Sequence, residues 1–144
     1  MVIDAEIDAA KLRKSIDRQA IADLLYRYAD GIDRRNWDVL QSCFTEDVAA
    51  DYGEVGKWYS AKEITEAMVE LHKNMGPTLH RISNVVVDFH GDAAPSRSYV
   101  HAVLNEDKAG SRVIQAYGHY SDQLVRQKAG WKISERKFTL VAML

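Results

Sequence analysis

The period of the apolar residues changes once along this chain, near residue 77, and this change constrains the fold more than any other feature. Before it, Ile21, Leu25 and Ile32 recur at helical spacing, which predicts a helix over residues 15–33. After it, alternating, β-branched and aromatic residues predict strands, and the short turns between them make consecutive strands antiparallel. The four predicted strands cover residues 78–89, 96–105, 112–127 and 131–142. Helices followed by such a meander indicate the α+β class.

Shorter elements complete the first half of the chain. Asn36 can cap a short helix, and the capping box from Ser60 to Glu63 opens a third one. Residues 48–52 predict a strand whose return lies at residues 57–59. We therefore expect helices packed on one face of a curved, mainly antiparallel sheet, which forms a cone with a pocket at its mouth.

The chain has 144 residues, a length that suits one domain. We expect residues 1–14 to form a loosely held arm and residues 15–144 to form a single domain, whose first helix is capped by Ser15 or Asp17. The start of the chain is acidic and lacks the apolar core of a secretory signal, and no apolar stretch approaches the length of a membrane span. These features predict a cytoplasmic protein without a membrane partner.

Charge and cysteine content exclude several classes of function. The chain carries 19 Lys and Arg against 21 Asp and Glu, and this balance argues against electrostatically driven binding of nucleic acid. The single cysteine, Cys43, cannot form an intramolecular disulfide. The histidines at positions 72, 80, 90, 101 and 119 show none of the close spacings that bind metals, so we expect no metal. We interpret His72 and His90 as surface residues.

Three segments, Tyr28–Asp38, Phe44–Asp47 and Gly130–Arg136, resemble the SnoaL-like branch of the nuclear-transport-factor-2-like superfamily. The resemblance covers about residues 15–142 and implies the cone-shaped roll of that superfamily. Within it, the chain is similar to scytalone dehydratase and to hexachlorocyclohexane dehydrochlorinase, which are cofactor-free lyases with an Asp–His pair in the cone. The superfamily also holds isomerases, cyclases and proteins without catalysis, so the fold does not settle the function.

The resemblance implies that Asp33 and His80 form the catalytic pair. An imidazole can take a proton from substrate, while a carboxylate on its other nitrogen fixes the tautomer and stabilises the imidazolium. Strand alternation places His80 on the face of Ile82 and Val86. Without the resemblance, the sequence favours Asp33 as a helix-end or turn residue and His80 as a hydrogen-bonded core histidine.

The resemblance adds further candidates. Tyr52 matches a strand tyrosine of the dehydratase, His101 matches its second histidine, and Arg136 matches an arginine of the dehydrochlorinase; all three are implied catalytic residues. An arginine on an apolar strand face needs a carboxylate or ligand partner. We expect an apolar pocket around the pair, with Tyr28, Tyr52, Tyr99 and Phe138 among its walls. The full set of predicted substrate-binding residues is Tyr28, Ile32, Tyr99, His119, Ser121 and Phe138.

These expectations combine into a cofactor-independent, dehydratase-like lyase that acts on a small cyclic, aromatic or polyketide-like molecule. The alternatives are an isomerase or cyclase with the same base, and a non-catalytic binding protein or partner subunit. The apolar run from Thr139 to Leu144 predicts a homo-oligomer. A trimer is favoured over a dimer because the two similar lyases are trimers.

Overall fold

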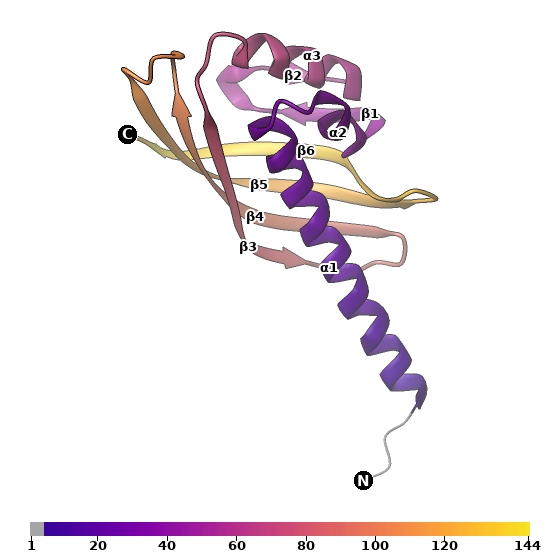
Figure 1. Ribbon diagram of the computed structural model, residues 1–144. Helices are drawn as coiled ribbons and strands as arrows, with labels where there is room; N and C mark the ends of the chain where they lie inside the picture. The colour runs from indigo at the N-terminus through magenta and orange to yellow at the C-terminus, as the bar shows by residue number, and fades with distance from the viewer. Residues whose placement is uncertain (1–4) are drawn as a thin grey trace.

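The computed structural model describes residues 5–144, with side chains from residue 8, as helices packed against one curved sheet (Figure 1). The expected α+β class is confirmed. The helices are α1 (Ala5–Asp33), α2 (Trp37–Ser42) and α3 (Ala61–His72), with a 3₁₀ turn η1 (Gly53–Val55). The strands are β1 (Phe44–Asp51), β2 (Lys57–Trp58), β3 (Thr78–Val87), β4 (Ala93–Asn105), β5 (Val113–Gln127) and β6 (Gly130–Met143).

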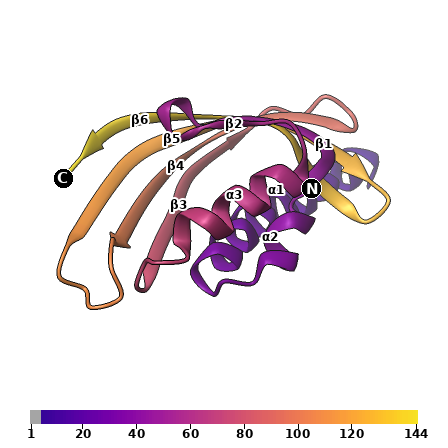
Figure 2. The same cartoon turned by 90° about the horizontal axis from the view of Figure 1, so that it is seen from above.

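The six strands form one sheet in the order β2-β1-β6-β5-β4-β3. Neighbouring strands are antiparallel except β1 and β6, which run parallel. Figure 2 shows the sheet bending around the helices, which lie on its concave side. Side chains alternate along each strand, so one row faces the helices and the next faces away. In β4, for example, Ser98 and Val100 are buried whereas Arg97 and Tyr99 are exposed.

The predicted local signals at the two shorter helices are confirmed. The Asn36 side chain accepts a hydrogen bond from the amide of Val39 at the start of α2. At the start of α3, Ser60 accepts from the amide of Glu63, whose carboxylate accepts from the amide of Tyr59. These contacts satisfy amide groups that have no partner within the helix.

Helix α1 is longer than the sequence pattern indicates. It begins at Ala5 and not at Ser15, and residues 8–16 are exposed. Alanine, leucine, lysine and arginine in this stretch have high helix propensity, so the helix continues where no apolar stripe supports it. Figure 1 shows this part of α1 projecting past the edge of the sheet. The first four residues of the predicted arm lie outside the described residues.

Asp17 does not cap α1 but anchors the helix to the sheet. Its carboxylate accepts hydrogen bonds from both terminal nitrogens of Arg126 on β5, at 2.9 and 2.8 Å. The Arg126 guanidinium lies 4.5 Å from the ring centre of Trp131. Hydrogen bonds from Arg126 lower the pKa of Asp17 from 3.8 to about 2, although burial opposes this change.

This anchor predicts a specific acid sensitivity. Because the pKa of Asp17 is lowered in the folded state, its contribution to stability is complete above pH 3.8 and is lost as the pH falls through about 2. Asp17→Asn should lower the free energy of unfolding at neutral pH by about 1.5–3 kcal/mol and flatten its acid dependence. Urea unfolding between pH 2 and 7 measures both effects; an unchanged acid dependence in the variant would refute this assignment.

A bulge in β3 changes which residues face the core. The pairing of β3 with β4 shifts register between Ser83 and Val86, and Asn84 adopts a left-handed backbone with φ of 53°. An extra residue of this kind reverses the alternation that follows it. Val86 therefore points away from the helices and is 53% exposed, so its predicted placement on the face of His80 is wrong. Ile82, which precedes the bulge, is half-buried on the inner side.

Candidate active site

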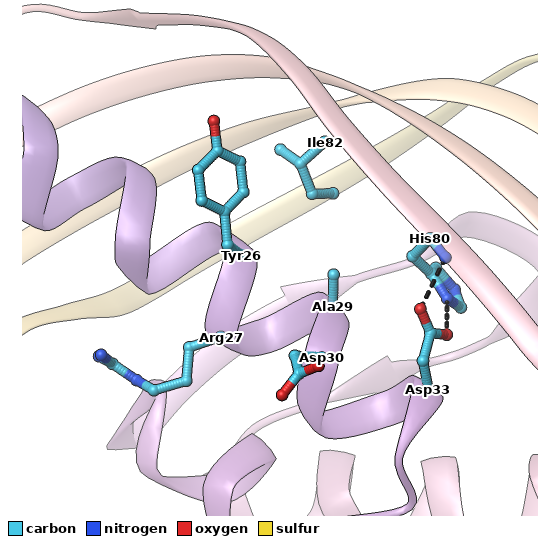
Figure 3. Close-up of a pocket in the computed structure, with 7 residues that line it drawn as sticks. All are labelled: Tyr26, Arg27, Ala29, Asp30, Asp33, His80 and Ile82. Carbon is cyan, nitrogen blue, oxygen red and sulfur yellow. Dashed lines mark hydrogen bonds and ion pairs between the residues drawn. The ribbon is translucent and has the colours of Figure 1, made fainter.

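The C-terminal end of α1 and the first residues of β3 bring Asp33 and His80 together, as Figure 3 shows. Asp33 Oδ1 lies 2.7 Å from His80 Nδ1, and Asp33 Oδ2 accepts a 2.8 Å hydrogen bond from the backbone amide of His80. The hydroxyl of Thr78 donates to Oδ1 at 2.9 Å. The predicted contact between the two side chains is thus present, well within hydrogen-bond reach.

The surroundings keep Asp33 ionised. Burial by itself raises the pKa of a carboxyl group, but hydrogen bonds from His80 and Thr78 and the electrostatic attraction to His80 outweigh it, so the pKa of Asp33 lies below 3.8. An ionised Asp33 only accepts hydrogen bonds, so His80 Nδ1 carries a proton and donates it to this carboxylate. The other ring nitrogen, Nε2, is then left as an acceptor.

A pocket of about 490 Å³ opens between α1 and the edge strand β3 at this pair. Besides Asp33 and His80, its lining residues are Tyr26, Arg27, Ala29, Asp30 and Ile82 (Figure 3). Most of the helix residues in this set lie three or four positions apart on α1, beside the stripe that packs into the core. The pocket combines an aromatic ring and aliphatic groups with charged side chains.

The predicted walls of this pocket are wrong. Tyr28 and Ile32 belong to the core-facing stripe of α1 and are each 1% exposed, so they point away from the pocket lining. Tyr52 and Phe138 pack with Tyr28 in the core. Helix periodicity places Tyr28 and Ile32 on one stripe of α1 and the pocket residues on a neighbouring stripe. The neighbouring stripe is the more polar of the two.

The buried tyrosines form a second polar cluster. The hydroxyl oxygens of Tyr28 and Tyr52 are 2.8 Å apart, and that of Tyr120 on β5 lies 3.4 Å from Tyr28. Burial raises the pKa of each of these phenols, so all three are protonated at neutral pH. In the described part of the chain, no hydrogen bond joins this cluster directly to Asp33 or His80.

Arg136 completes this cluster. Its guanidinium donates two 2.8 Å hydrogen bonds to Asp122 on the neighbouring strand, and both side chains are 0% exposed. It also lies over the rings of Tyr120 and Tyr28, at 3.7 and 4.3 Å from their centres. Burial alone would lower the pKa of Arg136, but the negative charge of Asp122 raises it well above the usual value of an arginine. The predicted need for a carboxylate partner is confirmed; the partner was not identified from the sequence.

Four predicted site residues lie on the opposite face of the sheet. In β4, Ala102 is paired with His80, whereas His101 is paired with Arg81 and faces away from the helices. His101 stacks on Tyr117 there, with ring centres 4.4 Å apart, and contacts Gln115. The others on this outer face, by the same pairing, are Tyr99, His119 and Ser121. Their placement in the pocket is therefore wrong, because a shift of one residue reverses a side chain's direction.

His72 is buried, contrary to its interpretation as a surface residue, whereas His90 is exposed as expected. At the end of α3, His72 Nδ1 lies 2.7 Å from the carbonyl oxygen of Met68, and its ring is 6.0 Å from that of Trp37. Burial lowers the pKa of His72. The helical pattern could have identified His72 as buried, because it lies four residues after the core residue Met68.

Within residues 8–144, no three His, Cys, Asp or Glu side chains gather in a group that could hold a metal ion. None of the helices described is both long and apolar enough to cross a membrane.

Comparison with known proteins places the chain in a family. Residues 13–137 match the model of the SnoaL-like domain. An uncharacterized protein of Mycobacterium tuberculosis (strain H37Rv), Rv2910c, is 30% identical over 121 residues, which are 83% of this chain and 82% of that protein.

Two solved structures share the fold at low sequence identity. One, from Novosphingobium aromaticivorans DSM 12444, is provisionally named a scytalone dehydratase; it has a TM-score of 0.84 and 21% identity, over 91% of this chain and 88% of that one. The other is the LinA-type3 hexachlorocyclohexane dehydrochlorinase of Novosphingobium barchaimii LL02, with a TM-score of 0.82 and 19% identity, over 93% and 92%. They confirm the nuclear-transport-factor-2-like fold. With the match over residues 13–137, the chain belongs to the SnoaL-like family.

Proposed function

We propose that this protein is a cofactor-independent lyase that acts on a small cyclic, aromatic or polyketide-like molecule, with His80 as its general base. The observation that carries the proposal is the 2.7 Å contact of His80 Nδ1 with an ionised Asp33 at the wall of an open pocket. A histidine that serves only the core has no need of a pocket, whereas a base must be reached by its substrate. The names of the two similar structures are consistent with a lyase.

The proposed reaction begins at His80 Nε2. This nitrogen takes a proton from a carbon of the substrate, and the electron pair of the broken C–H bond forms a double bond to the neighbouring carbon. The leaving group departs from that neighbouring carbon with its own bonding pair. Asp33 stabilises the imidazolium that forms, and the proton then passes to the leaving group or to water.

Tyr52 and Arg136 have less direct roles in this proposal. Tyr52 packs in the core against Phe138, and its hydroxyl lies 2.8 Å from that of Tyr28, so it supports the structure beside the pocket and does not touch the substrate. Arg136 holds the tyrosine rings in place through its contacts with Tyr28 and Tyr120. Because both residues are buried and separate from the pocket lining, their removal should cost less in catalysis than removal of His80.

A substrate screen tests the proposal. Phenolic ketones and hydroxylated or halogenated ring compounds are incubated with the protein, and the absorbance of each mixture is monitored. The products of any mixture that changes are then identified by mass spectrometry. A lyase gives a product lighter by the leaving group, whereas an isomerase gives one of unchanged mass. Compounds that bind without turnover would contradict the lyase and support a binding protein.

We also propose that the protein is a homo-oligomer, most simply a trimer. The end of β6 exposes apolar side chains: Val141 is 69% exposed, Met143 55% and the following Leu144 75%. On the outer face of the sheet, Tyr99 is 57% exposed. Exposed apolar groups this close together usually mark a contact between proteins.

The assembly prediction is checked by light scattering at micromolar concentration, where we expect a mass of three chains. Val141→Glu should shift the mass toward the single chain, because a charge would have to be buried in the contact. A wild-type protein that scatters as a single chain would contradict the proposal.

A further inference from the structure

Arg35 occupies a backbone position that favours glycine. It follows the last residues of α1 and adopts φ of 56°. The amide of Arg35 donates to the carbonyl of Ile32, and that of Asn36 donates to the carbonyl of Gly31, which is the hydrogen-bond pattern of a Schellman helix end. A non-glycine residue in this left-handed region carries backbone strain. This strain indicates that the arginine side chain makes contacts that a glycine at this position could not make.

The side chain of Arg35 ties the end of α1 to the start of β3. One terminal nitrogen, Nη1, donates to the carbonyl of Ile32 and to the hydroxyl of Thr78, both at 2.8 Å. The other, Nη2, donates to the carbonyl of Gly76, also at 2.8 Å. The planar guanidinium thus holds its partners at fixed relative positions, which a flexible lysine amine could not reproduce.

From Thr78 the hydrogen bonds continue to the proposed base. The Thr78 hydroxyl accepts from Arg35 and therefore directs its own proton to Asp33 Oδ1, 2.9 Å away. The same carboxylate oxygen also accepts a hydrogen bond from His80 Nδ1. The four side chains form one continuous chain of hydrogen bonds, in the order Arg35, Thr78, Asp33 and His80.

We infer that Arg35 and Thr78 are positioning residues that hold the Asp33 carboxylate in the orientation that fixes the tautomer of His80. The inference rests on the proposed function, because a fixed tautomer matters when Nε2 must accept a proton. Neither residue lines the pocket, so each acts through Asp33 and not on the substrate.

Two variants test the inference. Arg35→Gly removes the guanidinium but suits the left-handed backbone, so it should fold. Thr78→Val keeps the shape of the side chain and removes the hydroxyl, whereas Thr78→Ser restores a hydroxyl. Arg34→Ala is the matched control, since Arg34 is an exposed arginine in the same turn whose side chain bonds to Asp30.

The readout is the ¹⁵N NMR spectrum of the histidine rings at neutral pH, which reports the fraction of His80 that carries its proton on Nδ1 and needs no substrate. We expect a high fraction in the wild type, in Thr78→Ser and in Arg34→Ala, and a reduced fraction in Arg35→Gly and Thr78→Val. With a substrate, the last two should lose about 10–100-fold in kcat at a similar KM, as do variants that disturb the partners of metal-binding histidines.

The spectra also separate the inference from the proposed function. A wild-type fraction in folded Arg35→Gly or Thr78→Val would overturn the positioning role, whatever the activity. A reduced fraction in both variants upholds it, even if no substrate of the wild type is turned over. Absence of turnover together with a reduced fraction in both variants would contradict only the lyase proposal and not the positioning role.

Discussion

Replacing His80 with alanine is expected to lower kcat by about 10²–10⁴-fold, the usual contribution of a positioned acid or base. The substitution removes Nε2, the proton acceptor of the pair; the Asp33 carboxylate does not replace it, because its lowered pKa makes it a weak base and its oxygens already accept hydrogen bonds. Steady-state rates with a substrate from the screen measure the effect. KM should change little, since the imidazole contributes mainly to the transition state.

His90→Ala is the matched control for this experiment. His90 is an exposed histidine that pairs with Asp88 and is absent from the pocket lining, so its removal should leave kcat unchanged. Turnover by His80→Ala at the wild-type rate would mean that the pocket binds small molecules without using His80 as a base.

Asp122→Ala is expected to lower the free energy of unfolding by about 3–5 kcal/mol, because it leaves a buried guanidinium without its counter-charge. In the described part of the chain, Asp122 is the carboxylate that pairs with Arg136, whose Nη1 is already buried without a hydrogen bond. Urea or guanidinium unfolding followed by circular dichroism measures the change. A loss of this size is a large part of the stability of a small domain.

Two further variants make this prediction decisive. Asp92→Ala removes an exposed carboxylate that pairs with Arg126, and it should cost at most about 1 kcal/mol. Combining Asp122→Ala with Arg136→Met should restore part of the lost stability, because the unpaired charge is then gone. A cost for Asp122→Ala no larger than that for Asp92→Ala would show that the buried pair contributes little.

Local sequence signals predicted the elements well. The Ile21 to Ile32 stripe, the cap at Asn36 and the capping box at Ser60 each act over a few residues, and the structure has helices at all three places. The four long strands also lie where alternation put them, within a few residues at each end. Such signals work because the contacts that produce them are close in sequence.

Several predictions that depended on the direction of a side chain were wrong. Asn84 inserts a bulge that reverses Val86, and the pairing of Arg81 with His101 turns that histidine to the outer face. Both follow from register, which is set by contacts between distant segments and shifts every side chain when it moves by one residue. The Asp33–His80 contact escaped this problem because the resemblance supplied both residues together.

The supporting residues of the candidate site were harder to recognise. Asp122 and Arg136 find each other only through the pairing of β5 with β6. Arg35 could not be singled out from the sequence, since its left-handed backbone and its hydrogen bond to Thr78 are properties of the folded chain. Asp17 was predicted, as an alternative to Ser15, to cap the helix; its partner Arg126 is 109 positions away, so no local pattern could reveal the pair.

The most direct test of the central claim, that Asp33 and His80 act as one proton-transfer unit, is the rate of the double variant Asp33→Asn/His80→Ala beside the two single variants. Asparagine keeps the size of Asp33 but cannot balance an imidazolium, so Asp33→Asn alone should be strongly impaired. Once His80 is gone, no imidazolium forms and Asp33 has nothing left to stabilise. We predict that the double variant is no slower than His80→Ala. Losses that multiply in the double variant would contradict the claim, because each residue would then act independently.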